Sequence, residues 1–303
     1  MPTVRYAPID PALFAGNRER FAARLKPGSL AVFNANDVLP TNADGTMPFR
    51  QNNDLFYLSG VDQEESILLL FPDAPDGVHK EVLFVRETNE HIAVWEGHKL
   101  TKEEARTVSG IKKVYWTHEF EKLFFSLVVE AQHIYLNTNE HVRAEVFTET
   151  RDARFVNWCR KHYPMHSYER SAPVMHELRA IKSDIEVGLM QKACDLTGLG
   201  FKRILGFVKP GVWEYEIEAE MAHEFIRAGA GFAGYQPIIA SGGSSCVLHY
   251  NTNHQQCNDG DVLLLDFAAG YANYHSDLTR TIPVNGKFTP RQKDVYNAVL
   301  RVM

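Results

Sequence analysis

Residues 261–283 read DVLLLDFAAGYANYHSDLTRTIP, and this stretch decides how the second half of the chain folds. Two runs of strand-forming residues flank the turn-prone segment at residues 269–273. A hairpin folded about its midpoint, between Tyr271 and Ala272, would place Asp266 directly opposite Asp277. Both carboxylates would then point to the same face of the sheet, with Cβ atoms about 4.5–5.5 Å apart.

Two carboxylates held so close repel each other, and burial would raise at least one pKa. A shared proton, a basic partner or a bound cation would relieve the repulsion. Arg280 is a poor partner, because strand alternation sends it to the opposite face from Asp277. Oxygen ligands on strands suit divalent cations such as manganese, cobalt or zinc. A metal site, a shared proton in an acid-working enzyme and two unrelated acids near an exposed turn all stay open.

His249 lies seventeen residues before Asp266, at the end of a strand predicted at residues 247–250. A lone histidine is more often a hydrogen-bonded structural residue than a catalytic one, and the sequence pattern alone leaves both readings open.

Three short motifs resemble functional signatures without their structural context. Residues 229–234 (GAGFAG) match G-x-G-x-x-G, but here a helix precedes and a strand follows, so we predict a helix C-cap and turn. Residues 242–246 (GGSSC) lack the final glycine of a nucleophile elbow and predict a turn. No His-Glu pair has a second histidine one helical turn later, as a zincin-type site requires.

The composition limits the classes of protein to which the chain can belong. A net charge of −6 argues against a nucleic-acid partner. The longest apolar runs, at residues 67–71 and 262–265, are too short to cross a bilayer, and residues 1–8 lack the apolar core of a signal peptide. We therefore expect a cytoplasmic protein. We also expect its four cysteines to be reduced, small buried residues: Cys159, Cys194, Cys246 and Cys257.

The first part of the chain alternates strand and helix patterns, which predicts a layered α/β domain. It ends in a helical stretch at residues 148–161 and a loop around residues 164–173. The predicted strands are residues 28–34, 67–71, 81–85 and 134–136, and the predicted helices are residues 102–107 and 120–131.

A second unit opens at residues 177–183. Ser183 and Glu186 form a capping-box signature for a helix that continues to about Val208. Another amphipathic helix follows at residues 214–228, and then strands at residues 237–241, 247–250, 261–267 and 274–283. The last predicted helix, at residues 290–303, is still running at Met303, so we expect the chain to stop within an element.

Residues 238–288 resemble the catalytic domain of aminopeptidase P (Xaa-Pro aminopeptidase), a member of the pita-bread metallopeptidases. Residues 49–60 (FRQNNDLFYLSG) and 94–97 (VWEG) are similar to the N-terminal domain of that family. The resemblance implies an α/β N-terminal domain at residues 1–172. An α+β pita-bread (creatinase/aminopeptidase-like) domain would follow at residues 173–303, incomplete as given.

The same resemblance implies a role for each candidate site residue. Asp266 would chelate one of two divalent metal ions, and Asp277 would bridge both. Manganese is the expected metal, with cobalt or zinc as alternatives. His249 would be catalytic and hold the peptide or its tetrahedral intermediate. Tyr235 would lie behind the metal ligands, although an ordinary packing aromatic fits the sequence as well. Metal-activated hydroxide would then release the N-terminal residue of peptides with proline in second position.

The family's other ligands, one histidine and two glutamates, would lie downstream of Asp277. No histidine and only one acid, Asp294, follow it here. The resemblance thus implies that these 303 residues alone bind metal weakly and lack activity, and that the full-length form is a homo-oligomer. A prolidase-like Xaa-Pro dipeptidase and a non-catalytic binding module of histone-chaperone type remain alternatives, although the two aspartates favour an enzyme.

Overall fold

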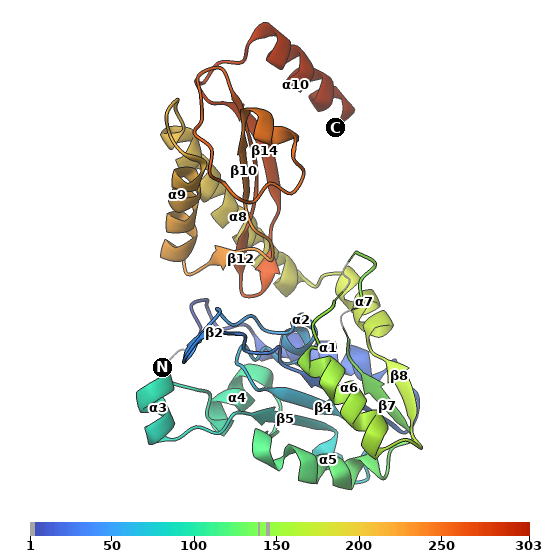
Figure 1. The fold of residues 1–303 in the computed structure, drawn as a ribbon. Helices are drawn as coiled ribbons and strands as arrows, with labels where there is room; N and C mark the ends of the chain where they lie inside the picture. Colours follow the sequence, from blue (N-terminus) through green and yellow to red (C-terminus); the bar gives the residue numbers. More distant parts are fainter. Residues whose placement is uncertain (1–3, 139, 144–145) are drawn as a thin grey trace. The chain divides into compact units, whose positions relative to one another are not determined.

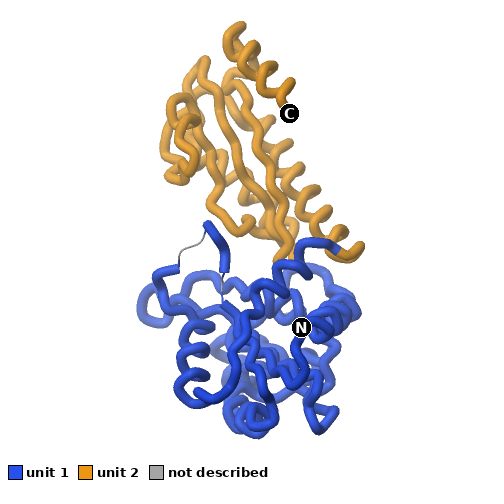
Figure 2. The backbone as a smooth tube through the Cα atoms, turned by 90° about the vertical axis from the view of Figure 1, so that its right-hand side faces the viewer, with its two compact units in different colours: residues 1–182 blue, residues 183–303 orange. Residues whose placement is uncertain are grey.

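The computed structural model describes residues 4–138, 140–143 and 146–303. The chain divides into two compact units, residues 1–182 and 183–303 (Figure 2). The predicted domain bounds, 1–172 and 173–303, stay a prediction. In the described part of the chain, no helix combines the length and the apolar character needed to span a membrane.

Unit 1 is built on a six-stranded sheet with the strand order β6-β5-β4-β1-β7-β8 (Figure 1). Only β4 runs against the other five strands. The central strands β1 and β4 are buried along their whole length, as expected for a sheet covered on both faces. The strands are β1 (Ser29–Asn34), β4 (Ile67–Leu70), β5 (Glu81–Val85), β6 (Lys113–Trp116), β7 (His133–Leu136) and β8 (Ser167–Arg170).

Helices cover both faces of this sheet, because neighbouring strand residues point to opposite sides. Ala31 and Phe33 pack with one set of helices, whereas Leu30 and Val32 pack with the other. The first set is α1 (Pro11–Ala22), α2 (Asn53–Ser59), α4 (Lys102–Ser109) and α7 (Ala172–Ala180), and the second is α5 (Phe120–Val128) and α6 (Arg151–His162). The smaller elements are β2 (Pro40–Asn42), β3 (Gly45–Thr46), η1 (Gly77–His79), α3 (Glu90–Glu96) and η2 (Thr117–Glu119).

The α/β prediction for this unit is confirmed, but the loop predicted at residues 164–173 is wrong. It contains the edge strand β8 and the start of α7. Strand β8 is short and none of its residues is fully buried, so it lacks the apolar run that marks the central strands. Met175 and Leu178 of α7 pack into the core of unit 1.

In unit 2 two helices, α8 (Asp184–Phe207) and α9 (Glu214–Arg227), pack on a sheet with the order β10-β11-β14 (Figure 1). The predicted capping box at Ser183 and Glu186 is present. The sheet strands are β10 (Ile238–Ser241), β11 (Val262–Phe267) and β14 (Leu278–Pro283). A smaller sheet joins β9 (Gly231–Phe232), β12 (Ala269–Tyr271) and β13 (Tyr274–His275), and η3 (Gly242–Cys246) and α10 (Pro290–Val302) complete the unit.

The predicted hairpin forms, but its predicted register is wrong. Asp266 lies opposite Thr279, and Tyr271 pairs with Tyr274, so the turn centre falls between Ala272 and Asn273. Both turn residues have positive φ, 50° and 60°, as a two-residue type I′ turn requires. Because the register moves by two residues, Asp277 keeps the predicted face but becomes a diagonal neighbour of Asp266.

The glycine-rich segment after α9 is the predicted helix cap. Gly229 has a φ of 75°, and the backbone N–H of Ala230 donates back to the carbonyl of Phe225 across the helix end. Residues 242–246 form the 3-10 turn η3. The strand predicted at residues 247–250 is wrong: this segment is a turn, and Val247 and Leu248 are exposed despite being apolar.

The prediction of buried cysteines holds for only two of the four. All four thiols are free, but Cys194 and Cys246 are exposed, whereas Cys159 and Cys257 are buried. Cys194 occupies a solvent-facing position of α8, and Cys246 ends the surface turn η3.

Candidate metal centre

Asp266 sits on β11, whose residues alternate between the core and the opposite face of the sheet. Leu263, Leu265 and Phe267 are buried in the core of unit 2. Asp266 therefore projects from the other face and is partly open to solvent. The apolar alternation of the strand fixes the direction of this carboxylate.

Asp277 lies between β13 and β14 and is exposed. The hairpin that carries it is tied to α8 through Thr197. The Thr197 hydroxyl lies 2.6 Å from Ser276 Oγ, and it accepts a hydrogen bond from the backbone N–H of Ala269 at 2.8 Å. The residue just before Asp277 is thus held to a long helix.

Tyr235 brings the two aspartates together. Its hydroxyl lies 3.0 Å from Asp266 Oδ1 and 3.1 Å from Asp277 Oδ1. Burial raises the pKa of Tyr235 above its ordinary range, and the two nearby carboxylates raise it further, so this hydroxyl keeps its proton. One hydroxyl proton can serve one carboxylate oxygen at a time, so the second carboxylate needs another partner, which solvent or a cation can supply.

The loop between β10 and β11 is organised by a residue that the sequence analysis did not identify. Glu214, fully buried at the start of α9, accepts hydrogen bonds from Ser241 N, Ser241 Oγ, Tyr250 Oη and Gln255 N at 2.7–2.9 Å. From the sequence, a glutamate in the first turn of a helix is expected only to interact favourably with the helix dipole. Its hydrogen bonds to residues far along the chain cannot be predicted from the neighbouring sequence.

Asn253 is a second such residue. It adopts a φ of 46° and is almost completely buried. Its amide donates to Glu218 and to the carbonyl of Pro237, and its Oδ1 accepts from Ile239 N. Asn253 therefore fixes the end of the loop against the start of β10, three residues after Tyr235.

His249, the third predicted site residue, lies in the exposed turn after η3 rather than on a strand. Among the residues that the structure describes, it has no hydrogen-bond or ion-pair partner. The structure thus brings Tyr235, Asp266 and Asp277 into one contact group and leaves His249 outside it.

The paired aspartates fit part of a metal centre. Carboxylate oxygens are suitable ligands for divalent cations, and two of them converge on one point. In the described part of the chain, however, no group of three or more potential ligand side chains gathers. The pair can therefore supply two ligands and needs others.

Comparison with known proteins agrees with this geometry. The family model of the aminopeptidase P N-terminal domain matches residues 14–135, and that of metallopeptidase family M24 matches residues 188–303. Xaa-Pro aminopeptidase of Escherichia coli is 31% identical over 288 residues, which cover 95% of this chain and 65% of that protein. Human Xaa-Pro aminopeptidase 3 is 30% identical over 84% of this chain and 50% of its own length.

Solved structures extend the similarity to the fold. Aminopeptidase P from E. coli with the inhibitor Pro-Leu has a TM-score of 0.84 at 31% identity, covering 97% of this chain and 67% of its own. Aminopeptidase PepP of Pseudomonas aeruginosa has a TM-score of 0.87 at 28% identity, covering 97% and 66%. The chain thus spans about two thirds of these structures and less than two thirds of the curated relatives.

The aspartate pair on its hairpin and the match over unit 2 define a class, the metallopeptidases of family M24. Within that class, the chain belongs to the aminopeptidase P family. The predicted family and fold are confirmed.

Proposed function

We propose that this protein acts as a metallopeptidase that releases the N-terminal residue from peptides with proline in second position. One observation carries the proposal: Asp266 and Asp277 converge on a single hydroxyl in a chain whose relatives are named Xaa-Pro aminopeptidases. Two neighbouring carboxylates serve no evident structural purpose on a partly exposed sheet face, whereas divalent cations would use both.

In this proposal Asp266 and Asp277 would both help to hold the divalent cations. When bound, the cations would polarise the scissile carbonyl and lower the pKa of a water molecule. Tyr235 donates to a carboxylate oxygen and fixes the orientation of the pair. His249 contacts the peptide from the loop that Glu214 and Asn253 anchor.

We propose manganese as the native metal, with cobalt and zinc as the alternatives. Oxygen-rich sites on strands accept all three, and one neighbouring structure is a zinc-substituted E. coli aminopeptidase P in complex with product. Metal analysis of the protein purified without added metal distinguishes them. An excess of manganese supports the proposal, and a stoichiometric excess of zinc or cobalt contradicts it.

A panel of three peptides tests the reaction itself. The full-length protein should cleave an Xaa-Pro-Yaa tripeptide and release Xaa, while an Xaa-Ala-Yaa tripeptide should turn over at least about a hundredfold more slowly. Cleavage of an Xaa-Pro dipeptide in preference to the tripeptide would favour the dipeptidase alternative. No turnover of any of the three peptides, with metal supplied, would contradict the enzyme and favour the binding module.

We further propose a cytoplasmic homo-oligomer that binds neither membrane nor nucleic acid. Four free thiols suit a reducing compartment, and the exposed pair Val94 and Trp95 on α3 offers apolar surface for self-association. Cell fractionation tests the location, and light scattering of the purified protein tests the assembly. A monomer at micromolar concentration would contradict the oligomer.

A further inference from the structure

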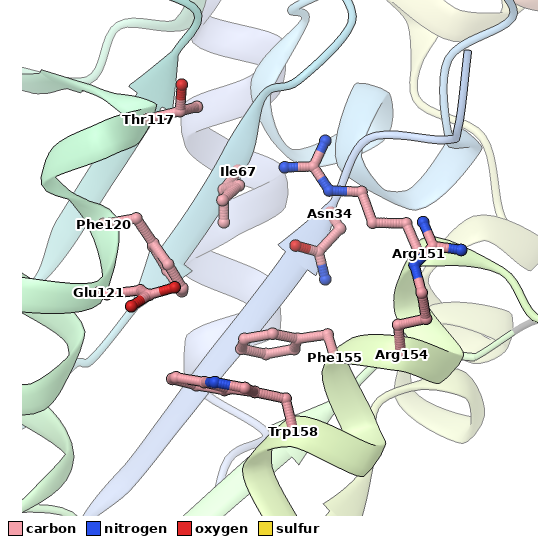
Figure 3. A pocket seen from close by; sticks show the side chains of 9 residues that line it. All are labelled: Asn34, Ile67, Thr117, Phe120, Glu121, Arg151, Arg154, Phe155 and Trp158. Atoms are coloured by element: carbon pink, nitrogen blue, oxygen red, sulfur yellow. The ribbon is translucent and has the colours of Figure 1, made fainter.

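A cavity in unit 1, apart from the aspartate pair, opens where the strands β1 and β6 end (Figure 3). Its volume is about 340 Å³. Asn34 is the last residue of β1, and Thr117 follows β6 directly. Crevices beside the carboxyl ends of parallel strands are common ligand sites in α/β sheets. The position therefore suits a small molecule.

Two arginines on α6 line this cavity, and within the part of the chain that the structure describes only one of them forms an ion pair. Arg154 pairs with Asp37. The guanidinium of Arg151 has neither a hydrogen-bond nor an ion-pair partner among the described residues, and it extends above Asn34 (Figure 3). Burial lowers the pKa of Arg151, as expected for a cation that loses water without gaining a direct partner. Arg151 thus offers free donors to an anionic group.

Aromatic rings form one wall of the cavity (Figure 3). Phe155 and Trp158 stack with ring centroids 5.6 Å apart and planes 20° apart. The ring of Phe120, from α5, meets Phe155 edge-on at 5.8 Å. This wall would accept the side chain of an apolar or aromatic ligand.

Two further polar residues that line the cavity, Glu121 and Asn34, present acceptor oxygens. Glu121 lies at the start of α5, across the cavity from the two arginines in Figure 3. Within the described residues it has no ion-pair partner, so neither arginine neutralises it. Asn34 donates its amide to Asp152 at 2.9 Å, which leaves its Oδ1 as an acceptor on the side of the cavity. These acceptors suit an ammonium group.

We propose that this cavity binds a free amino acid with a large apolar or aromatic side chain. Arg151 holds the carboxylate, Glu121 and Asn34 hold the ammonium, and Phe155 and Trp158 receive the side chain. The volume is at the lower end of the range for small-molecule sites, which matches a ligand of this size. The site belongs to unit 1 alone and does not depend on the proposed peptidase activity.

Titration calorimetry with L-phenylalanine tests the site, with 3-phenylpropionate and phenethylamine as probes that lack the ammonium or the carboxylate. Wild-type protein should bind L-phenylalanine saturably and each of the other two probes at least about tenfold more weakly. R151Q and E121Q should each weaken L-phenylalanine binding by at least about tenfold. R160Q, which removes an exposed arginine of the same helix outside the cavity, should bind as wild type does.

Far-ultraviolet circular dichroism and thermal unfolding confirm that each variant is folded before binding is compared. Three outcomes would overturn the proposal. They are no saturable binding of L-phenylalanine by the wild type, equally tight binding of 3-phenylpropionate, and equal losses in R160Q and R151Q. The second would identify a simple anion site, and the third a non-specific effect of charge.

Discussion

At the scale of single residues, the candidate centre depends on how one hydroxyl serves two carboxylates. Tyr235 contacts Asp266 and Asp277 at nearly equal distances, although it has one proton to donate. The sequence indicated that two acids would share a face and left the role of Tyr235 open. The structure identifies Tyr235 as the residue that contacts both.

Replacing Tyr235 with phenylalanine should destabilise the metal-free protein by about 1 kcal/mol, because a partly exposed hydrogen bond to a charged acceptor is lost. Urea denaturation in the presence of a chelator measures the change. Tyr215→Phe is the matched control, since Tyr215 is exposed and its hydroxyl makes none of the described hydrogen bonds. Equal stability of wild type and Y235F would show that the hydroxyl does not hold the pair.

The buried carboxyl of Asp152 should make the free energy of unfolding depend on pH. Burial raises its pKa from 3.8 to about 7. The unfolded chain therefore loses this proton at lower pH than the folded protein does. The stability that Asp152 contributes is fully present below about pH 4, falls as the pH rises toward 7, and is constant above that.

Asp152→Asn should remove this dependence while keeping an acceptor for the Asn34 amide. The stability of D152N relative to wild type should rise between pH 4 and pH 7, by roughly 4 kcal/mol at most. Chemical denaturation across that pH range gives the difference. A constant difference would mean that Asp152 is ionised in the folded protein throughout.

At the scale of elements, the turn at Ala272 and Asn273 sets the register that places Asp277. The residue pattern predicted the hairpin and the face of both aspartates, because alternation of side chains survives a register shift of two. The turn centre was missed, because neither Ala272 nor Asn273 is a glycine that would mark the left-handed positions. Because alanine carries a Cβ, the positive φ of Ala272 strains the backbone.

Ala272→Gly should therefore stabilise the hairpin by about 0.5–1 kcal/mol, since glycine adopts positive φ without a steric penalty. Ala269→Gly is the control of opposite sign, because Ala269 lies in β12 without a positive φ and should be destabilised by the same change. Thermal unfolding compares the two. If both glycines destabilise to a similar extent, strain at Ala272 is not significant.

The shape of the loop that carries His249 could not be predicted from the local sequence. Its apolar residues Val247 and Leu248 gave a strand pattern, but hydrogen bonds to Glu214 and Asn253 hold the loop in another shape. Those contacts join residues 14–41 positions apart, and no local pattern encodes them. Tertiary contacts of this kind override strand propensity.

Glu214→Gln should release this loop, because an amide would face donors where the carboxylate now accepts four hydrogen bonds. The loss should be roughly 2–4 kcal/mol, and Tyr250→Phe, which removes one donor, should lose about 1 kcal/mol. Hydrogen exchange at residues 241–255 reports the opening. Unchanged protection in E214Q would contradict the anchoring role.

At the scale of the whole molecule, two units with separate cores carry separate potential sites. Strand and helix periodicity was sufficient to predict the α/β character of the first unit and, in the second, the helices α8, α9 and α10 and the strands β10, β11 and β14. It could not predict β8, an edge strand without an apolar run, or the cavity beside Arg151, which forms only where distant elements meet. The central claim concerns unit 2: that Asp266 and Asp277 hold divalent metal.

Manganese binding by the full-length protein, measured by electron paramagnetic resonance with three variants, tests that claim most directly. D266N and D277N should each lose the bound manganese, with affinity falling at least about tenfold, because each removes a charged ligand. D294N, an exposed aspartate of α10, should bind as wild type does. Manganese binding that is unchanged in D277N would contradict the account.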